Sequence, residues 1–165
     1  MFALLTLVSS ALALASGVAA DFIPAGTAAH IFSTQNTSLA LAPEAAASNA
    51  YLEVTLPGDG SSADSSAFYI VSGSGVPSQI AYGDWCITAK GVVPESSSQI
   101  LYIAECDATD SAQLWTLNEN PSTISNADGN CITLGRPANG VSVVLDFCEE
   151  ELQDHQLWVP KAISA

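Results

Sequence analysis

The sequence predicts an all-β domain assembled from repeated units, and three observations support this prediction. First, Gln-Leu-Trp occurs at residues 113–115 and returns unchanged at 156–158, 43 positions later. Second, Cys-Ile-Thr precedes each copy, at 86–88 and at 131–133. Third, short segments rich in β-branched and aromatic residues fill the sequence between these motifs. A repeat of this size indicates supersecondary units that bury their apolar faces only against one another.

Residues 1–20 have the features of a secretory signal peptide. Residues 3–15 are almost wholly apolar, and Val18-Ala19-Ala20 places small residues ahead of the polar Asp21. Serine and glycine interrupt the apolar run, which is too short for the about 20 residues that a membrane span needs. We therefore expect a secreted protein, not inserted in a membrane, whose single domain occupies 21–165.

The charge of the chain excludes some partners. It has 17 acidic residues against three basic ones, for a net charge of −14. Nucleic acid is an unsuitable partner because its phosphates are bound through clusters of Lys and Arg. Only 12% of the residues are charged, which suits a secreted β-protein with neutral polar loops.

Four cysteines in an exported chain predict two disulfides. Of the three possible pairings, the repeat selects the one in which each unit closes its own bridge. The pairs are then Cys86–Cys106 and Cys131–Cys148. Each bridge would stabilise the fold by about 3 kcal/mol in the loop-entropy treatment.

The repeat continues into the cysteine-free segment that follows Asp21. Leu39-Ala40-Leu41 stands in the place of Cys-Ile-Thr, and Tyr69 stands in the place of the tryptophan. The alternating segment 51–56 takes the place of the strand that leads to the second cysteine. Residues 40–50 form either one helical turn or a loop insertion. The chain thus divides into three units of roughly 45 residues, about 21–82, 83–127 and 128–165.

The later strands are separated by turn residues. Asp-Gly at 128–129 and Asn-Gly at 139–140 supply the positive φ values of tight hairpins. No segment after Ala50 shows a sustained helical period, so helices should be nearly absent. The strands predicted from composition are 85–89, 98–105, 113–117, 130–134, 141–147 and 156–159.

Three units of about 45 residues, with cysteine pairs and Gln-x-Trp motifs, resemble the ricin-type β-trefoil lectins. The resemblance implies a six-stranded barrel capped by three hairpins with pseudo-threefold symmetry. It also implies that Trp115 and Trp158 pack between units in the interior, and that Gln113 and Gln156 tie neighbouring backbone groups. These four residues would then be scaffold.

The resemblance further implies a noncatalytic protein that binds glycans or glycoproteins. Sugar-binding members of the family place an acid two residues after the first cysteine, and an aromatic residue two before the second. A polar residue stands two positions before the aromatic one, and an asparagine precedes the glutamine. In the second and third units of this chain, the acid is replaced by Thr88 and Thr133, and the aromatic residue by Ala104 and Asp146. The polar residue is replaced by Tyr102 and Val144, and the asparagine by Ala112 and His155.

The sugar sites are therefore degenerate, and two altered sites are candidates. In the second unit Tyr102 could stack on a sugar ring, displaced by one pleat, beside Thr88. The alternative is a half-exposed strand aromatic without a ligand. In the third unit Thr133, Asp146 and His155 could converge as a polar cluster, or Asp146 and His155 could be merely solvated. The first unit offers Leu41, Leu52, Val54 and Ser66 in these places and looks empty.

The sequence gives no support for catalysis, a metal site or a cofactor. The cysteines are expected to be paired, and no Gly-x-Ser-x-Gly elbow occurs. The acidic run 149–151 suits a solvated turn better than a pair of glycosidase carboxylates. The acidic loops 107–110 and 149–154 lack the glycine-punctuated spacing of a calcium site.

Two other function classes remain open. One is a protein-binding trefoil such as a protease inhibitor, with 91–98, including Pro94, as its docking loop. The other is a structural secreted protein without a ligand. A glycan array with competition by free sugar separates these classes. In each case Asn36-Thr37-Ser38 is an N-glycosylation sequon, and a glycan at Asn36 or an unmodified polar residue are both open.

Overall fold

The computed structural model describes residues 23–57, 66–92, 98–120, 122–149 and 154–163. The predicted signal peptide lies outside these residues. The described chain forms 13 strands and two short 3₁₀ turns. They are β1 (Thr27–Ser33), β2 (Ala40–Pro43), β3 (Leu52–Thr55), β4 (Ala67–Ile70), β5 (Ile80–Tyr82), β6 (Trp85–Val92), β7 (Gln99–Glu105), η1 (Ser111–Gln113), β8 (Thr116–Leu117), β9 (Ile124–Ser125), β10 (Asn130–Thr133), β11 (Val141–Ser142), β12 (Val144–Phe147), η2 (Asp154–Gln156) and β13 (Trp158–Ala162).

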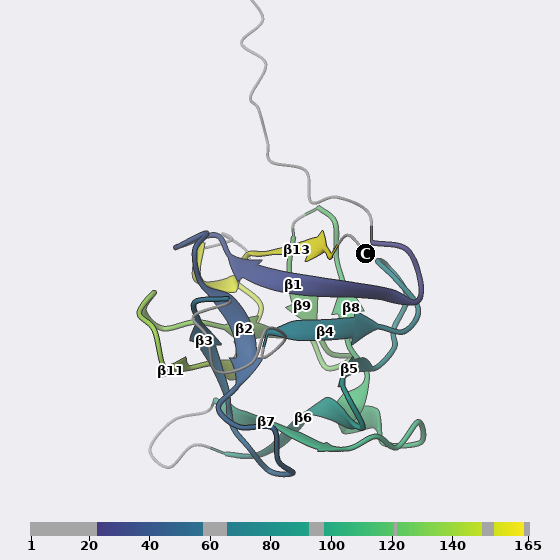
Figure 1. Cartoon of the computed structure of the whole chain (residues 1–165). Coiled ribbons are helices and arrows are strands. Elements are labelled where there is room, and N and C mark those ends of the chain that lie inside the picture. The colour runs from purple at the N-terminus through teal and green to yellow at the C-terminus, as the bar shows by residue number, and fades with distance from the viewer. Residues whose placement is uncertain (1–22, 58–65, 93–97, 121, 150–153, 164–165) are drawn as a thin grey trace, which may run out of the picture.

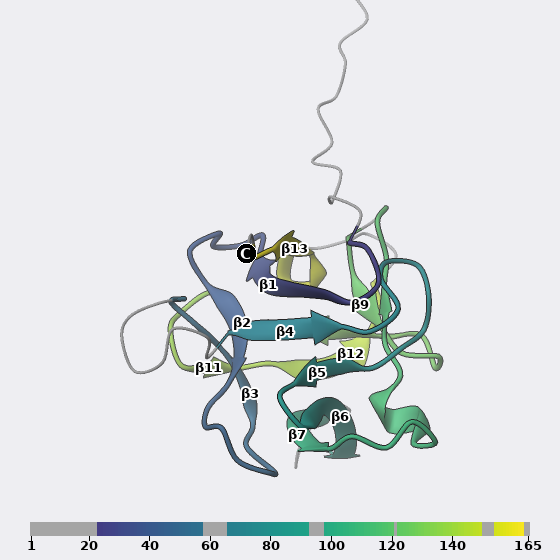
Figure 2. The same ribbon diagram turned by 45° about the vertical axis from the view of Figure 1, so that its right-hand side comes forward.

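Six of these strands close into a barrel, part of which is seen in Figures 1 and 2. β1 pairs with β13 on one side and with β4 on the other; β4 then pairs with β5, and β8 with β9. Ser78 and Trp115 exchange two backbone hydrogen bonds of 2.9 Å, which join the chain entering β5 to the chain entering β8. The Trp158 amide donates to the Ser122 carbonyl at 2.8 Å and joins β13 to the chain entering β9. The ring order is therefore β1, β4, β5, β8, β9, β13.

Three hairpins extend from this ring. They are formed by β2 with β3, β6 with β7, and β10 with β12. The hairpins also contact one another: β3 pairs with β11, β7 pairs with β12, and Tyr51 bridges to Tyr102. The predicted β-trefoil, with a six-stranded barrel and three hairpins, is thus confirmed.

Both predicted disulfides are confirmed. Cys86 is bonded to Cys106 and Cys131 to Cys148, and the Cα atoms are 4.9 Å apart in each pair. Each bridge joins the first strand of a hairpin to the end of its second strand. The pairing follows the repeat, since each unit closes its own bridge.

The core includes one apolar pair from each hairpin and three large aromatic side chains. The cross-strand pairs are Leu41 with Val54, Ile87 with Ile103, and Ile132 with Leu145, all buried. Trp115 and Trp158 are buried as predicted, and each indole donates to a backbone carbonyl. Phe68 is the buried aromatic residue of the first unit.

The sequence register predicted for the first unit is wrong by one residue. Leu41 faces the core opposite Val54, so it corresponds to Ile87 and not to Thr88. Tyr69 was expected in the tryptophan position, yet it is 48% exposed, whereas Phe68 is fully buried. The error matters because successive strand residues point to opposite faces, so a slip of one residue exchanges core and surface.

Three local predictions also need correction. Gln113 and Gln156 do not begin strands; each ends a 3₁₀ turn, and the strand starts at or just after the tryptophan. In η1 the Asp110 carboxylate caps the turn by accepting from the Ala112 amide at 2.9 Å. A helical turn within 40–50 is likewise wrong, because Ala40–Pro43 is strand β2 and the rest is loop.

Candidate functional site

A cleft of about 550 Å³ opens on the outer face of the β6–β7 hairpin. The outer face is set by strand alternation: Ile87 and Ile103 point into the core, so Thr88 and the opposite Tyr102 lie on the other face. Tyr102 is half-buried, whereas Thr88 is only 2% exposed and lies at the floor of the cleft. The chain after Cys106 curves back as η1 and forms the far wall. The residues that line the cleft are Thr88, Tyr102, Ala104, Glu105, Cys106, Asp107, Ala108, Asp110 and Gln113.

Gln113 holds this wall in place. Its Nε2 donates to the Glu105 carbonyl at 2.9 Å, and its Oε1 accepts from the Asp107 amide at 2.8 Å. One buried side chain thus binds the peptide groups on both sides of Cys106. The Gln79 side chain donates to the same Oε1 at 2.9 Å.

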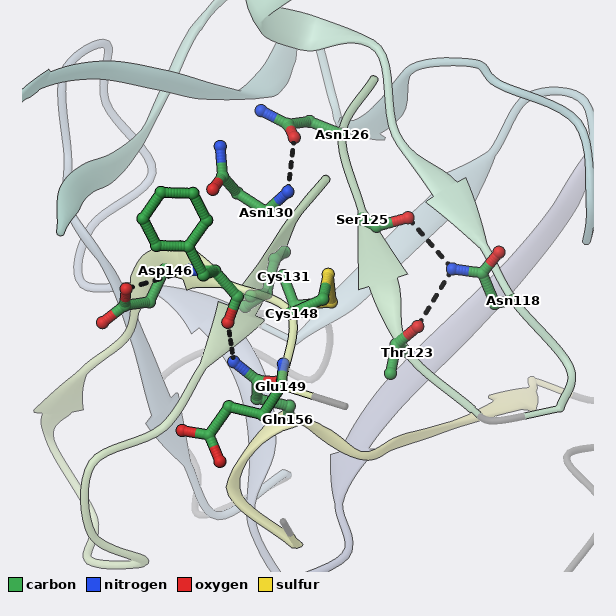
Figure 3. Close-up of a disulfide and its surroundings, with 12 residues drawn as sticks. Asn118, Thr123, Ser125, Asn126, Asn130, Cys131, Asp146, Cys148, Glu149 and Gln156 are labelled. Atoms are coloured by element: carbon green, nitrogen blue, oxygen red, sulfur yellow. Dashed lines mark hydrogen bonds between the residues drawn. A yellow bond between two sulfur atoms is a disulfide. The ribbon is translucent and has the colours of Figure 1, made fainter. Parts of the chain in front are cut away.

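Gln156 repeats the arrangement in the third unit, beside the Cys131–Cys148 disulfide (Figure 3). Its Nε2 donates to the Phe147 carbonyl at 2.7 Å, and its Oε1 accepts from the Glu149 amide at 2.9 Å. The contacts agree with the predicted tying role of both glutamines. Neither side chain is exposed.

Thr88 and Tyr102, the two candidates predicted in the second unit, lie opposite each other in the cleft. The Thr88 hydroxyl donates to the Cys86 carbonyl at 3.0 Å, which leaves its lone pairs as acceptors. Burial raises the pKa of the Tyr102 phenol, and the nearby Asp110 carboxylate raises it further. The phenol is therefore neutral at ordinary pH and can donate a hydrogen bond.

Sequence reasoning missed Asp107 and Asp110 as cleft residues. Asp107 Oδ1 accepts from the amide and the hydroxyl of Thr109, and these bonds hold the pKa of Asp107 below its ordinary value. Asp110 is fixed by its capping bond to Ala112. The available signal is the acidic run 107–110 after Cys106, whose spacing does not suit a calcium site. The two carboxylates provide the acidic lining that Thr88 cannot.

The three candidates of the third unit have separate partners. Thr133 is buried, as Thr88 is; its hydroxyl donates to the Cys131 carbonyl and accepts from Gln156 at 3.0 Å. Asp146 accepts from the Ser98 hydroxyl at 2.9 Å. His155 Nε2 lies 3.4 Å from Glu149 Oε1. In the contacts described here, no two of the three candidates are bonded to each other.

The corrected register changes which residues of the first unit face outward. Leu41, Leu52 and Val54 are core residues, so they cannot line a surface site. The other face of this hairpin carries Ala42 and the opposite Glu53; Ala42 is buried and Glu53 is half-buried. Burial raises the pKa of Glu53, and the neighbouring Glu44 raises it further.

The remaining predictions concern loops. Asn36 lies in the turn between β1 and β2, where its side chain accepts from the Ser38 amide at 3.1 Å. Residues 93–97 of the predicted docking loop, including Pro94, lie outside the described residues. Within the described ranges, no helix is long and apolar enough to cross a membrane. The same ranges contain no group of three metal-ligating side chains.

Fold and site together define a disulfide-bonded β-trefoil with an acidic, tyrosine-containing cleft on its second hairpin. The sequence profile of the ricin-type β-trefoil lectin domain matches residues 78–163, more than half of the chain. The chain therefore belongs to this family. Among curated proteins, none matches the sequence.

Solved structures with the same fold include lectins and a toxin. The C-half of an earthworm R-type lectin, solved with GalNAc, has 15% identity and a TM-score of 0.61 over 83% of this chain and 99% of that chain. The β-trefoil lectin of the Vibrio vulnificus hemolysin, solved with N-acetyl-D-lactosamine, has 16% identity and a TM-score of 0.57 over 86% of this chain and 98% of that chain. A mosquitocidal holotoxin has 12% identity and a TM-score of 0.68 over 84% of this chain, which spans 17% of the holotoxin chain. At these identities the likeness shows the fold.

Proposed function

We propose that this protein is a secreted, noncatalytic lectin that binds a glycan in the cleft of its second unit. The observation that carries the proposal is the meeting of Tyr102, Thr88 and Asp110 in one open cleft. The family and the sugar-bound structural neighbours support it. The proposal includes a signal peptide at 1–20 and one domain of three units at 21–165.

The cleft offers the three kinds of contact that a sugar needs. The Tyr102 ring provides an apolar face for the C–H groups of a pyranose. The Thr88 hydroxyl accepts one hydrogen bond from a sugar hydroxyl. The carboxylates of Asp107 and Asp110 accept further bonds, and charge makes these the stronger ones.

We place the sugar in the second unit because Tyr102, Thr88 and the two carboxylates line one cleft there. In the third unit Asp146 is bonded to Ser98, and His155 lies 3.4 Å from Glu149. We assign no bond-breaking step to the cleft, and the described cysteines are all held in disulfides.

A glycan array with competition by free sugar tests the proposal. We expect Tyr102→Ala to weaken binding about tenfold, because the stacking face and its buried area are lost. Tyr69→Ala is the matched control, since Tyr69 is an exposed tyrosine on β4 that does not line the cleft. A wild-type protein that bound no glycan would overturn the proposal.

Asp110→Asn separates charge from structure at the same site. Asparagine caps a helical turn as well as aspartate does, so η1 should persist. We expect weaker glycan binding with an unchanged melting temperature. The control is Asp128→Asn, which removes one charge from an exposed turn outside the cleft. An equal loss of glycan affinity in both variants would mean that binding depends on the net charge of the protein and not on Asp110 itself.

A further inference from the structure

A residue of the first unit lies next to Tyr102, one of the residues that line the cleft of the second unit. Tyr51, just before β3, lies directly opposite Tyr102 of β7 in an antiparallel bridge. The Ile103 amide donates to the Ala50 carbonyl at 3.0 Å, one residue away from each tyrosine. This pattern makes Tyr51 and Tyr102 a non-hydrogen-bonded pair, in which the side chains are closest and share one face. Figures 1 and 2 both show the β2–β3 loop beside β7.

Three side chains therefore form one row across the outer face. Thr88 is opposite Tyr102 on one side, and Tyr51 is opposite Tyr102 on the other. Neighbouring strands are about 4.8 Å apart, so the row spans roughly 10 Å of backbone. Tyr51 is 49% exposed, so a large part of its side chain is open to a ligand. The row is longer than a single sugar ring requires.

Carboxylates border the outer end of this row. Glu53 follows Tyr51 by two residues on β3 and so shares its face. The Glu44 amide donates to the Tyr51 carbonyl at 2.9 Å, which places Glu44 across from Tyr51. The Glu44 charge also acts on Glu53 and raises its pKa. An anionic ligand would be repelled here, whereas neutral hydroxyls find acceptors.

We infer that Tyr51 forms a second sugar subsite, and that the ligand is a neutral oligosaccharide lying across the seam between the first and second units. This inference rests on the proposed function of the cleft. Tyr102 holds one ring of the ligand, and Tyr51 stacks against a ring further along. Affinity then rises with chain length until the second ring reaches Tyr51.

The test compares neutral sugars of increasing length on the full chain. The probes are two series: galactose, N-acetyllactosamine and lacto-N-neotetraose in one, and N-acetylglucosamine, N,N′-diacetylchitobiose and tetra-N-acetylchitotetraose in the other. Calorimetry measures wild type, Tyr51→Ala and Tyr69→Ala. Tyr69 is a close control because it is a tyrosine of nearly equal exposure, 48% against 49%. The Tyr51 ring resonances of the unaltered chain, followed by NMR during titration, provide a readout that requires no substitution.

We expect Tyr51→Ala to weaken tetrasaccharide binding about three- to tenfold while leaving monosaccharide binding unchanged. Tyr69→Ala should bind every probe as wild type does. Equal tetrasaccharide affinity in wild type and Tyr51→Ala, with binding retained, would overturn the second subsite and leave the lectin proposal standing. The second subsite would also be overturned if the tetrasaccharide shifted the Tyr102 resonances but not those of Tyr51. A wild-type protein inert toward both series and toward the array would overturn both proposals.

Discussion

The indole nitrogen of Trp115 donates to the carbonyl oxygen of Ile87 at 2.8 Å in the core. Trp158 does the same to Ile132 at 2.9 Å. In both units the acceptor is the residue that follows the first cysteine, so the indole ties the end of its unit to the start of the hairpin. A buried N–H needs such a partner. The repeated tryptophan is thus explained by both its volume and its single donor.

Replacing Trp158 should separate these two contributions. We expect Trp158→Ala to lower the free energy of unfolding by about 3–5 kcal/mol, because a large buried side chain is removed. Trp158→Phe should cost about 1–3 kcal/mol, since it keeps most of the volume and leaves the Ile132 carbonyl unpaired. Urea denaturation measures both values. Wild-type stability in the alanine variant would contradict the interior placement of the ring.

Neighbouring aromatic residues in β4 test the corrected register of the first unit. Phe68 is fully buried and Tyr69 is 48% exposed. We expect Phe68→Ala to cost about 3–5 kcal/mol, whereas Tyr69→Ala should stay within about 0.5 kcal/mol of wild type. The two variants share one strand and one measurement, which makes each the control of the other. Equal losses would contradict the register.

Gln113 should matter for both stability and binding. Gln113→Ala removes the partners of the Glu105 carbonyl and the Asp107 amide, and we expect a cost of about 1–3 kcal/mol. Glycan affinity should fall as well, because the wall that holds Asp107 loosens. Gln79→Ala removes only the bond to Gln113 Oε1 and should cost about 1 kcal/mol or less. If the two variants were equally stable, Gln113 would not be holding the wall.

The raised pKa of Glu53 predicts that the stability of the folded protein depends on pH. Its pKa in the folded state lies above the ordinary value of 4.5, through burial first and Glu44 second. The folded state therefore holds the proton more tightly than the unfolded state does. The resulting stabilisation is complete below about pH 4.5 and is lost as the pH rises through the higher folded pKa.

Glu53→Gln should consequently raise the melting temperature at about pH 7 and flatten its decline above about pH 4.5. Differential scanning calorimetry at several pH values measures this effect. Glu119→Gln, on an exposed residue after β8, serves as the control for lost net charge. A Glu53→Gln profile parallel to that of wild type would show that Glu53 is not the responsible group.

The repeat in the sequence predicted the fold because spacing reports symmetry directly. Two copies of Gln-Leu-Trp and two cysteine pairs in register require two equivalent units, and a third is needed to cover them. The disulfides followed from the same spacing. The first unit was less accurate, since it lacks cysteines to mark the strand face. There the alternation of Leu39 to Leu41 alone left the register open by one residue.

Of the four residues proposed to contact the sugar, two could be predicted from the sequence. Thr88 and Tyr102 share one hairpin, so strand alternation was enough to place them on one face. Asp107 and Asp110 reach the cleft through the 3₁₀ turn that ends at Gln113, whereas the sequence pattern predicted only a strand beginning at Gln113. For Thr133, Asp146 and His155, a shared unit did not mean shared contacts, because Ser98 and Glu149 take two of the three.

The sequence by itself determined the all-β class, the threefold plan and both disulfides of this protein, because these depend on residue spacing along one chain. Tertiary structure decided which face the first unit presents and how the chain after Cys106 folds back over the cleft. It also decided that Tyr51 stands opposite Tyr102. These residues are 51 positions apart in different units, and no local pattern connects them. Their pairing depends on how two hairpins pack around a common axis, which is a property of the assembled barrel.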